Sequence, residues 1–166
     1  MIQLLSRSQA QLYKQISNSI NEPKFNELVF QAQMVELIPL LGERLYYDIQ
    51  QNINNYDDLL DGSTYEIGGI TYTNVGLRAV LTHYWYAYHS FYGDQIDTAF
   101  GLREKMNNDV SSQVSTTMKK TTFEMNSRYA FTLFANVDKF LIRTRNPLYK
   151  CGTITPNRHF RINKIG

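Results

Sequence analysis

The sequence predicts a mainly α-helical protein, a bundle of about four to five helices with a small β-hairpin and an extended C-terminal arm. Three observations predict this class. Apolar residues recur at spacings of three and four over most of the chain. A single Gly-Gly pair separates two short β-prone runs. After Asp138 the sequence contains no further acidic residue. With 166 residues, we expect one helical domain over 1–145 and a basic arm over 146–166.

Composition excludes several classes of protein. The chain is 43% hydrophobic and 19% charged, which is typical of a globular protein and not of a disordered one. The sequence contains no stretch of about 18 apolar residues, so no transmembrane helix is predicted. The first residues lack the pattern of a secretory signal peptide. One cysteine, Cys151, excludes a disulfide framework within the chain.

The first half of the chain reads as short helices separated by breakers. We expect helices over 6–20, 23–38 and 43–52, with a further short turn over 56–60. Pro23 suits the first turn of the second helix. Pro39 interrupts the helical pattern and Gly42 permits a turn, so the second helix should end there.

The second half contains the hairpin and the two longest helices. Residues 64–73 form two β-prone runs around Gly68-Gly69, which accept the positive φ angles of a tight turn. We expect helices over 75–93 and 119–145. The polar stretch between them, 94–117, has no clear period and is predicted to be a long loop.

The helix over 75–93 carries aromatic residues around most of its girth. Such a helix is usually central in a protein or lies between partners. Stacking of nucleic-acid bases on these rings would need a cationic groove, and the run from Tyr84 to Tyr92 holds no Lys or Arg. We therefore expect these rings to pack in the core or between subunits.

Charge is unevenly distributed along the chain. From Leu141 to Gly166 there are six basic residues and no acidic one, whereas the first 140 residues hold 11 basic and 15 acidic residues, a net charge of −4. Such asymmetry indicates an arm that meets something negative, either nucleic acid or an acidic protein surface such as a neighbouring copy. A solvated terminus is the other interpretation. Apolar residues in the arm, among them Phe160, favour docking over a purely solvated tail.

Motifs for chemistry are missing from the sequence. It contains no phosphate-binding loop, dinucleotide fingerprint, zinc-protease motif or nucleophile elbow. His83 and His89 are six residues apart, on different faces of one helix, and a packed or surface role is expected for both. Cys151 lacks an obvious neighbouring base. Asp57, Asp58 and Asp61 are expected to form a solvated turn or helix cap. We therefore predict no enzymatic activity, no catalytic residue, no cofactor and no metal site.

Two segments, FQAQMVELIPLLGERLYYDI (30–49) and DTAFGLREKMNNDVSSQVS (97–115), lie around a Tyr-rich helix. Their order, together with the turns between them, resembles small head–tail connector proteins of tailed phages, the neck adaptor or ring proteins of crAss-like and other Bacteroidetes phages. The shared pattern extends over roughly residues 25–145. It comprises Pro39–Gly42, Leu45-Tyr46, Leu59–Gly62, Gly68-Gly69 and Gly76–Arg78.

This resemblance implies a non-enzymatic structural protein of the virion. Such proteins form a ring, typically of twelve copies, below the portal protein, where they help to dock the tail and surround the channel through which the genome is ejected. The implied partners are further copies of the chain, the portal and other neck or tail rings, with non-specific proximity to genomic DNA and no membrane. The protein would be made in the host cytoplasm and reside at the head–tail interface of the virion.

We expect the hairpin, the loop 94–117 and the arm to make the contacts between subunits and between rings. The residues predicted to lie at these interfaces are Tyr65, Ile67, Ile70, Tyr72, Phe100, Leu102, Tyr149, Arg158, Phe160 and Arg161. The alternative function is a small nucleic-acid-binding module that uses the arm. Its total charge of only +2 and the absence of an evident basic helix face count against it.

Overall fold

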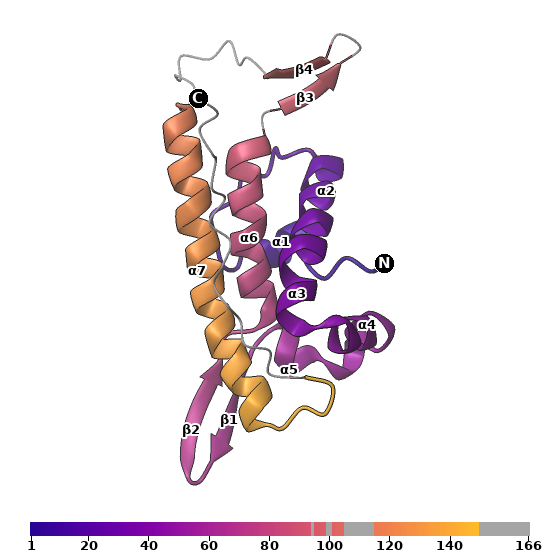
Figure 1. Cartoon of the computed structure of the whole chain (residues 1–166), viewed down its shortest axis with the longest axis vertical. Helices are drawn as coiled ribbons and strands as arrows, with labels where there is room; N and C mark the ends of the chain where they lie inside the picture. The colour runs from indigo at the N-terminus through magenta and orange to yellow at the C-terminus, as the bar shows by residue number, and fades with distance from the viewer. Residues whose placement is uncertain (94, 99–100, 105–114, 150–166) are drawn as a thin grey trace, which may run out of the picture.

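A computed structural model describes residues 1–93, 95–98, 101–104 and 115–149, the two short stretches as strand backbone only (Figure 1). The longer helices are α2 (Glu22–Ala32), α4 (Glu43–Gln51), α6 (Leu77–Tyr92) and α7 (Thr116–Arg143). The short helical pieces are α1 (Arg7–Ala10), the π-helix η1 (Gln33–Leu37), α3 (Ile38–Leu41), the 3-10 helix η2 (Ile53–Asn55) and α5 (Asp57–Leu60). Strands β1 (Ser63–Ile67) and β2 (Ile70–Asn74) form an antiparallel hairpin. The predicted class, mainly helical with a small hairpin, is confirmed.

Helix α6 is the centre of the molecule. It packs between α7 on one side and α2 on the other, and the hairpin extends below them (Figure 1). None of its sixteen residues is exposed. Trp85 is fully buried, lies 4.7 Å from the Phe25 ring, and donates a hydrogen bond from Nε1 to the Phe25 carbonyl oxygen at 3.2 Å. The aromatic helix therefore forms the core of a single chain.

A polar contact ties α6 to η1. The Tyr88 hydroxyl donates to Glu36 Oε1 at 2.8 Å. Burial, followed by the nearby Glu36 carboxylate, raises the pKa of Tyr88 and of Tyr84 well above its ordinary value. Both phenols are therefore neutral near neutral pH, and Tyr88 can donate to the carboxylate without a second charge being buried.

The N-terminal residues are held by one buried side chain, Gln33 of η1. Its Oε1 accepts from the Leu4 amide at 2.8 Å, and its Nε2 donates to the Ile2 carbonyl at 3.2 Å and the Tyr46 hydroxyl at 2.9 Å. Gln33 is 0% exposed, so these partners replace the water that a buried amide loses. Leu4 itself is buried in the core.

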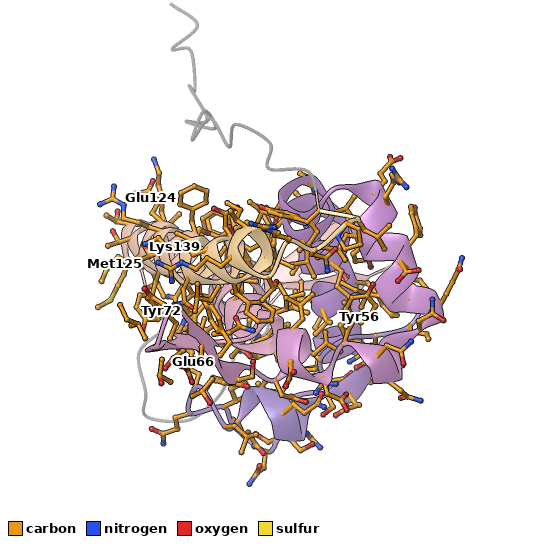
Figure 2. The ribbon with its side chains drawn as sticks, turned by 90° about the horizontal axis from the view of Figure 1, so that it is seen from below. Tyr56, Glu66, Tyr72, Glu124, Met125 and Lys139 are labelled. Atoms are coloured by element: carbon orange, nitrogen blue, oxygen red, sulfur yellow. The ribbon has the colours of Figure 1, made fainter. Side chains whose placement is uncertain are left out.

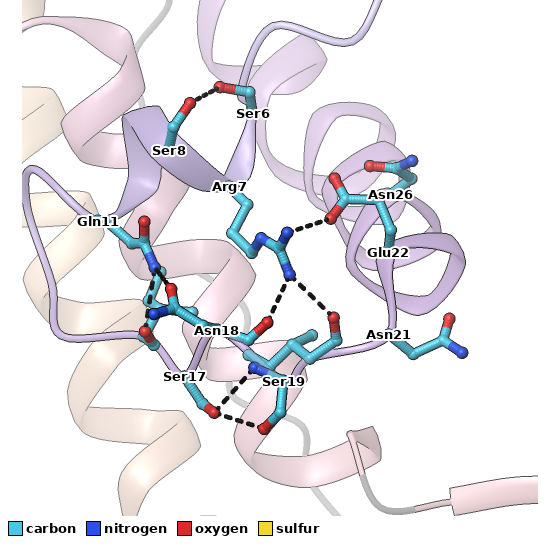
Figure 3. Close-up of polar contacts among 12 residues, drawn as sticks. Ser6, Arg7, Ser8, Gln11, Ser17, Asn18, Ser19, Asn21, Glu22 and Asn26 are labelled. Atoms are coloured by element: carbon cyan, nitrogen blue, oxygen red, sulfur yellow. Dashed lines mark hydrogen bonds and ion pairs between the residues drawn. The ribbon is translucent and has the colours of Figure 1, made fainter.

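The helix predicted over 6–20 is wrong in its length. The capping box of Ser6 and Gln9 starts α1, which ends at Ala10. Beyond it, short polar side chains bond to one another and to nearby backbone, and such bonds compete with helix formation. Arg7 Nη1 donates to the carbonyls of Asn18 and Ile20, and Gln11 Nε2 donates to Asn18 Oδ1 at 2.7 Å (Figure 3). These residues form a folded loop.

The break expected at Pro39 is displaced. The chain passes from α2 through η1 into α3, where Pro39 lies in the first turn, and the helical path ends at Gly42. A proline in a first turn removes no helical hydrogen bond, because that amide has no partner inside the helix. The π-helix before it contains Gln33.

Four other elements match their expected ranges to within three residues: α4, α5, the β1–β2 hairpin and α6. The predicted loop 94–117 is wrong in part, because a second antiparallel pair, β3 (Gln95–Thr98) and β4 (Gly101–Glu104), lies within it. Helix α7 also starts earlier than expected, at Thr116, with the Ser115 side chain accepting from the Met118 amide.

Candidate interaction surfaces

The β1–β2 hairpin is fixed against the last turns of α7. Tyr65 and Tyr72 face each other across the hairpin with ring centroids 5.6 Å apart. Tyr65 meets the edge of Phe140 at 5.1 Å, and the Arg143 guanidinium lies 3.9 Å over the Tyr72 ring. Arg143 also donates to the Tyr65 hydroxyl at 3.2 Å. Both predicted interface tyrosines are therefore half-buried in contacts within their own chain.

Asn136 of α7 continues this attachment at the base of the hairpin. Its Nδ2 donates to the Thr73 carbonyl and its Oδ1 accepts from the Val75 amide, each at 2.9 Å. A two-stranded hairpin is marginal in water by itself. Here α7 supplies the contacts that set its position.

Among the described residues, none makes such a contact with the tip of the same hairpin. Ile67 and Ile70 pair across the turn and are 40% and 57% exposed. Gly68 and Gly69 both have positive φ, 60° and 78°, as a tight two-residue hairpin turn requires. A side chain added at either glycine would meet open space. The two predicted isoleucines thus form an apolar tip at the lower end of the molecule (Figure 1).

The remaining predicted interface residues are divided between described and undescribed parts of the chain. Tyr149 packs beside the core and donates its hydroxyl to Asp138 Oδ1 at 2.5 Å, so the start of the arm folds back onto α7. Phe100, Arg158, Phe160 and Arg161 lie outside the described residues, and of Leu102 only the backbone in β4 is described.

Helix α7 has an exposed face that the sequence analysis missed. Met118 and Met125 are 61% and 66% exposed, and Tyr129 is 52% exposed. Arg128 and Lys139 are also exposed. We call the surface formed by these five residues the α7 outer face. The spacings of seven, three and four among Met118, Met125, Arg128 and Tyr129 could have revealed it, but the stronger apolar pattern on the core side of α7 obscured it.

The α7 outer face is basic as well as apolar. Residues 116–149 hold six basic and two acidic residues, a net charge of +4. Of the two acids, Asp138 accepts the Tyr149 hydroxyl, and Glu124, next to Met125, is exposed (Figure 2). Arg128 and Lys139 take part in none of the ion pairs among the described residues. Two exposed cations outside ion pairs of the described residues therefore lie on a helix for which the sequence analysis expected no evident basic face.

The opposite charge gathers around α4 and α5. Residues 43–61 hold five acidic residues and one basic residue, a net charge of −4. Asp61 pairs with Arg78, and Asp48 accepts the Tyr56 hydroxyl. Three carboxylates, those of Glu43, Asp57 and Asp58, remain exposed and outside the ion pairs of the described residues.

Apolar surface accompanies these carboxylates. Tyr47, one turn from Glu43 on α4, is 48% exposed. We call the surface formed by Glu43, Tyr47, Asp57 and Asp58 the acidic end. As expected from the sequence, Asp57 and Asp58 lie in an exposed turn, the first turn of α5.

The two surfaces lie on different sides of the molecule. In Figure 1, α7 forms the left side and α4 the right, with α6 between them. Figure 2 shows the same separation from below, with Met125 and Lys139 on the left and Tyr56, directly before α5, on the right. The chain therefore presents the cations of α7 and the carboxylates of the acidic end on two sides that cannot meet within one molecule.

His83 and His89 occupy separate packed positions on α6, whereas His159 lies outside the described residues. The His83 ring meets the edge of Tyr129 at 4.5 Å and its Nδ1 lies 3.5 Å from Asn126 Oδ1, and burial lowers its pKa. His89 stacks on Trp85 with centroids 4.9 Å apart. Within the described ranges, no three His, Cys, Asp or Glu side chains are grouped to hold a metal ion.

One shallow hollow of about 710 Å³ lies beside the N-terminal loop, lined by Lys14, Gln15, Ile16, Ser17 and Tyr86. Lys14 Nζ sits 4.0 Å over the Tyr86 ring, and burial lowers its pKa. The cation is therefore already engaged with an aromatic ring of the same chain. The described helices include none with the length and apolarity to cross a bilayer.

These features define a helical protein whose core is complete in one chain and whose outer surfaces combine apolar and charged residues. Residues 37–157 match the model of a family of unknown function, DUF6712. The match spans most of the chain, so the protein belongs to this family. No curated protein and no solved structure matches the chain.

Proposed function

We propose that this protein is a structural subunit of the virion of a tailed phage, forming a ring at the head–tail interface. In this role it docks the tail to the portal and surrounds the channel for DNA ejection. The sequence resemblance over residues 25–145 suggests this function. The observation that carries it structurally is the presence of two unlike surfaces, the α7 outer face and the acidic end, on different sides of a completed core.

Ring formation needs two different surfaces on each subunit. When two different surfaces of one subunit meet in a head-to-tail manner and the rotation closes, the product is a ring. The apolar tip at Ile67 and Ile70 lies at one end of the molecule, where it supports a contact with a ring above or below. The basic arm would contact an adjoining ring in the same way.

Native mass spectrometry of the purified chain, alone and with the portal and neck proteins of the same phage, tests this function. We expect a discrete high-order ring, alone or on a partner, and its mass gives the number of copies, typically twelve in proteins of this kind. A chain that stays monomeric in every mixture would contradict the proposal.

The second candidate is a nucleic-acid-binding module. The exposed Arg128 and Lys139 on α7, together with the basic arm, favour it. Contacts to several phosphates make affinity fall steeply with salt, by about a thousandfold or more between 50 and 200 mM for six to ten contacts. A monomer that binds duplex DNA with such a salt dependence would support this alternative, and salt-independent binding would contradict it.

A further inference from the structure

We propose that the α7 outer face of one copy binds the acidic end of the next copy, and that this contact links neighbouring subunits of the ring. The inference rests on the proposed function and adds the two surfaces and the residues that meet. The occupant of the α7 outer face is thus a second copy of this chain.

Charge complementarity is the first argument. The α7 outer face carries two cations, Arg128 and Lys139, with one exposed carboxylate, Glu124, beside it, and the acidic end carries three carboxylates. Arg128 and Lys139 on one side, and Asp57 and Asp58 on the other, are exposed and outside the ion pairs of the described residues. Complementary charge fixes the register of a contact and disfavours like-to-like pairing.

The apolar residues on both surfaces favour a protein partner over nucleic acid. Met118, Met125 and Tyr129 are each more than half exposed on α7, and Tyr47 is nearly so on α4. Methionine, aromatic residues and arginine are enriched in protein–protein interfaces. A phosphate backbone would leave these methionines without an apolar partner, whereas a second copy supplies one.

The position of the two surfaces is the third argument. They lie on different sides of α6, so α7 and α4 of one chain cannot satisfy each other (Figures 1 and 2). A symmetric two-fold dimer through the α7 outer face would place the cations of both copies in one interface, where they repel one another. A head-to-tail arrangement pairs every basic side with an acidic side around a closed ring.

Charge-swapped variants test this pairing. The α7 variant, Arg128→Glu with Lys139→Glu, presents two acidic sides. The end variant, Asp57→Lys with Asp58→Lys, presents two basic sides. We expect each alone to lose the ring, with a subunit dissociation constant at least about tenfold higher than that of the wild-type chain.

Two combinations should restore assembly. An equal mixture of the two variants again pairs opposite charges and should form rings of alternating subunits. A single chain carrying all four substitutions should form rings by itself. The control, Glu66→Lys on β1, reverses the charge of an exposed acidic residue that lies outside both surfaces and outside the ion pairs of the described residues, and it should leave the pairing of subunits unchanged.

Folding is checked separately from assembly. Circular dichroism and the thermal midpoint of each variant establish that the body is intact. If the lysine substitutions in α5 disturb the fold, Asp57→Asn with Asp58→Asn removes the charge with almost the same side-chain shape and should weaken the ring in the same direction.

The outcomes separate the inference from the function. Rings that form in the wild type and are unaffected by either reversal would overturn the inference and leave the proposed function standing. Rings that fail in both variants but are not restored by mixing would also overturn it. If the α7 variant keeps its rings but loses duplex DNA binding, α7 is a nucleic-acid surface, and the inference is wrong. A wild-type chain that never assembles, with or without its neck partners, would contradict the function and the inference together.

Discussion

Helices α6 and α7 lie side by side and share one interface, yet they differ in how much of their surface the chain itself covers. No residue of α6 is exposed. Helix α7 buries Ala130, Phe134, Val137 and Leu141 against the body, while Met118 and Met125 remain exposed, and Tyr129 is half exposed at the edge of its contact with His83 of α6. The core thus lies within one chain, and the apolar surface left exposed on α7 is available for contact with another molecule. Substitutions in α6 should therefore affect stability, and substitutions on the α7 outer face should affect assembly.

Trp85→Ala should give the largest loss of stability. The side chain is fully buried between Phe25 and His89, and its replacement leaves a cavity and an unpaired Phe25 carbonyl. We expect the free energy of unfolding to fall by about 3–5 kcal/mol in denaturant titrations. Met125→Ala, the control on the exposed side of α7, should cost about 0.5 kcal/mol or less. Equal losses for the two variants would contradict the distinction between the helices.

Gln33→Leu should cause the next largest loss in the free energy of unfolding. It leaves the Leu4 amide and the Tyr46 hydroxyl without their buried partner. Unsatisfied buried polar groups predict a loss of about 1–3 kcal/mol, with faster hydrogen exchange at the Leu4 amide. Gln51→Leu, at an exposed position of α4, is the matched control. An unchanged exchange rate at Leu4 would show that Gln33 does not hold the N-terminal segment.

Asn136→Ala should loosen the hairpin without unfolding the bundle. The substitution removes the hydrogen bonds to the Thr73 carbonyl and the Val75 amide. We expect a loss of about 1–2 kcal/mol and faster amide exchange at Val75, measured by NMR. Thr132→Ala, at an exposed position on the same helix, should leave that exchange unchanged.

Raising the pH above 10 should lower the free energy of unfolding by a smaller amount, through ionisation of Tyr56. Burial, followed by the hydrogen bond to Asp48 and the charge of that carboxylate, raises the pKa of Tyr56 from 10.0 to about 12. The folded state therefore favours the neutral phenol. Its contribution to stability is fully present below pH 10 and is lost as the pH rises from 10 towards 12. Tyr56→Phe should show a shallower decline in the free energy of unfolding over this range; an identical decline would contradict the assignment.

The sequence was informative where one strong pattern decides the structure. Gly68-Gly69 located the hairpin, and the aromatic run located α6 as a central helix. It failed over 11–20, where hydrogen bonds of Arg7 and Gln11 with Asn18 outweigh a weak apolar spacing. Tyr65 and Tyr72 were predicted to contact another subunit, whereas the structure places them against Phe140 and Arg143 of the same chain, a contact that depends on tertiary packing and that no local pattern indicates.

The most direct test of the account is methionine oxidation of the wild-type protein, followed by mass spectrometry, in the free chain and in the assembled ring. Met118 and Met125 are exposed on α7, and Met34, which is 47% exposed in η1 outside both proposed surfaces, is the internal control. We expect the oxidation rates of Met118 and Met125 to fall on assembly while the rate at Met34 stays the same. Equal rates at Met118 and Met125 in the free and assembled protein would contradict the claim that the α7 outer face joins one subunit to the next.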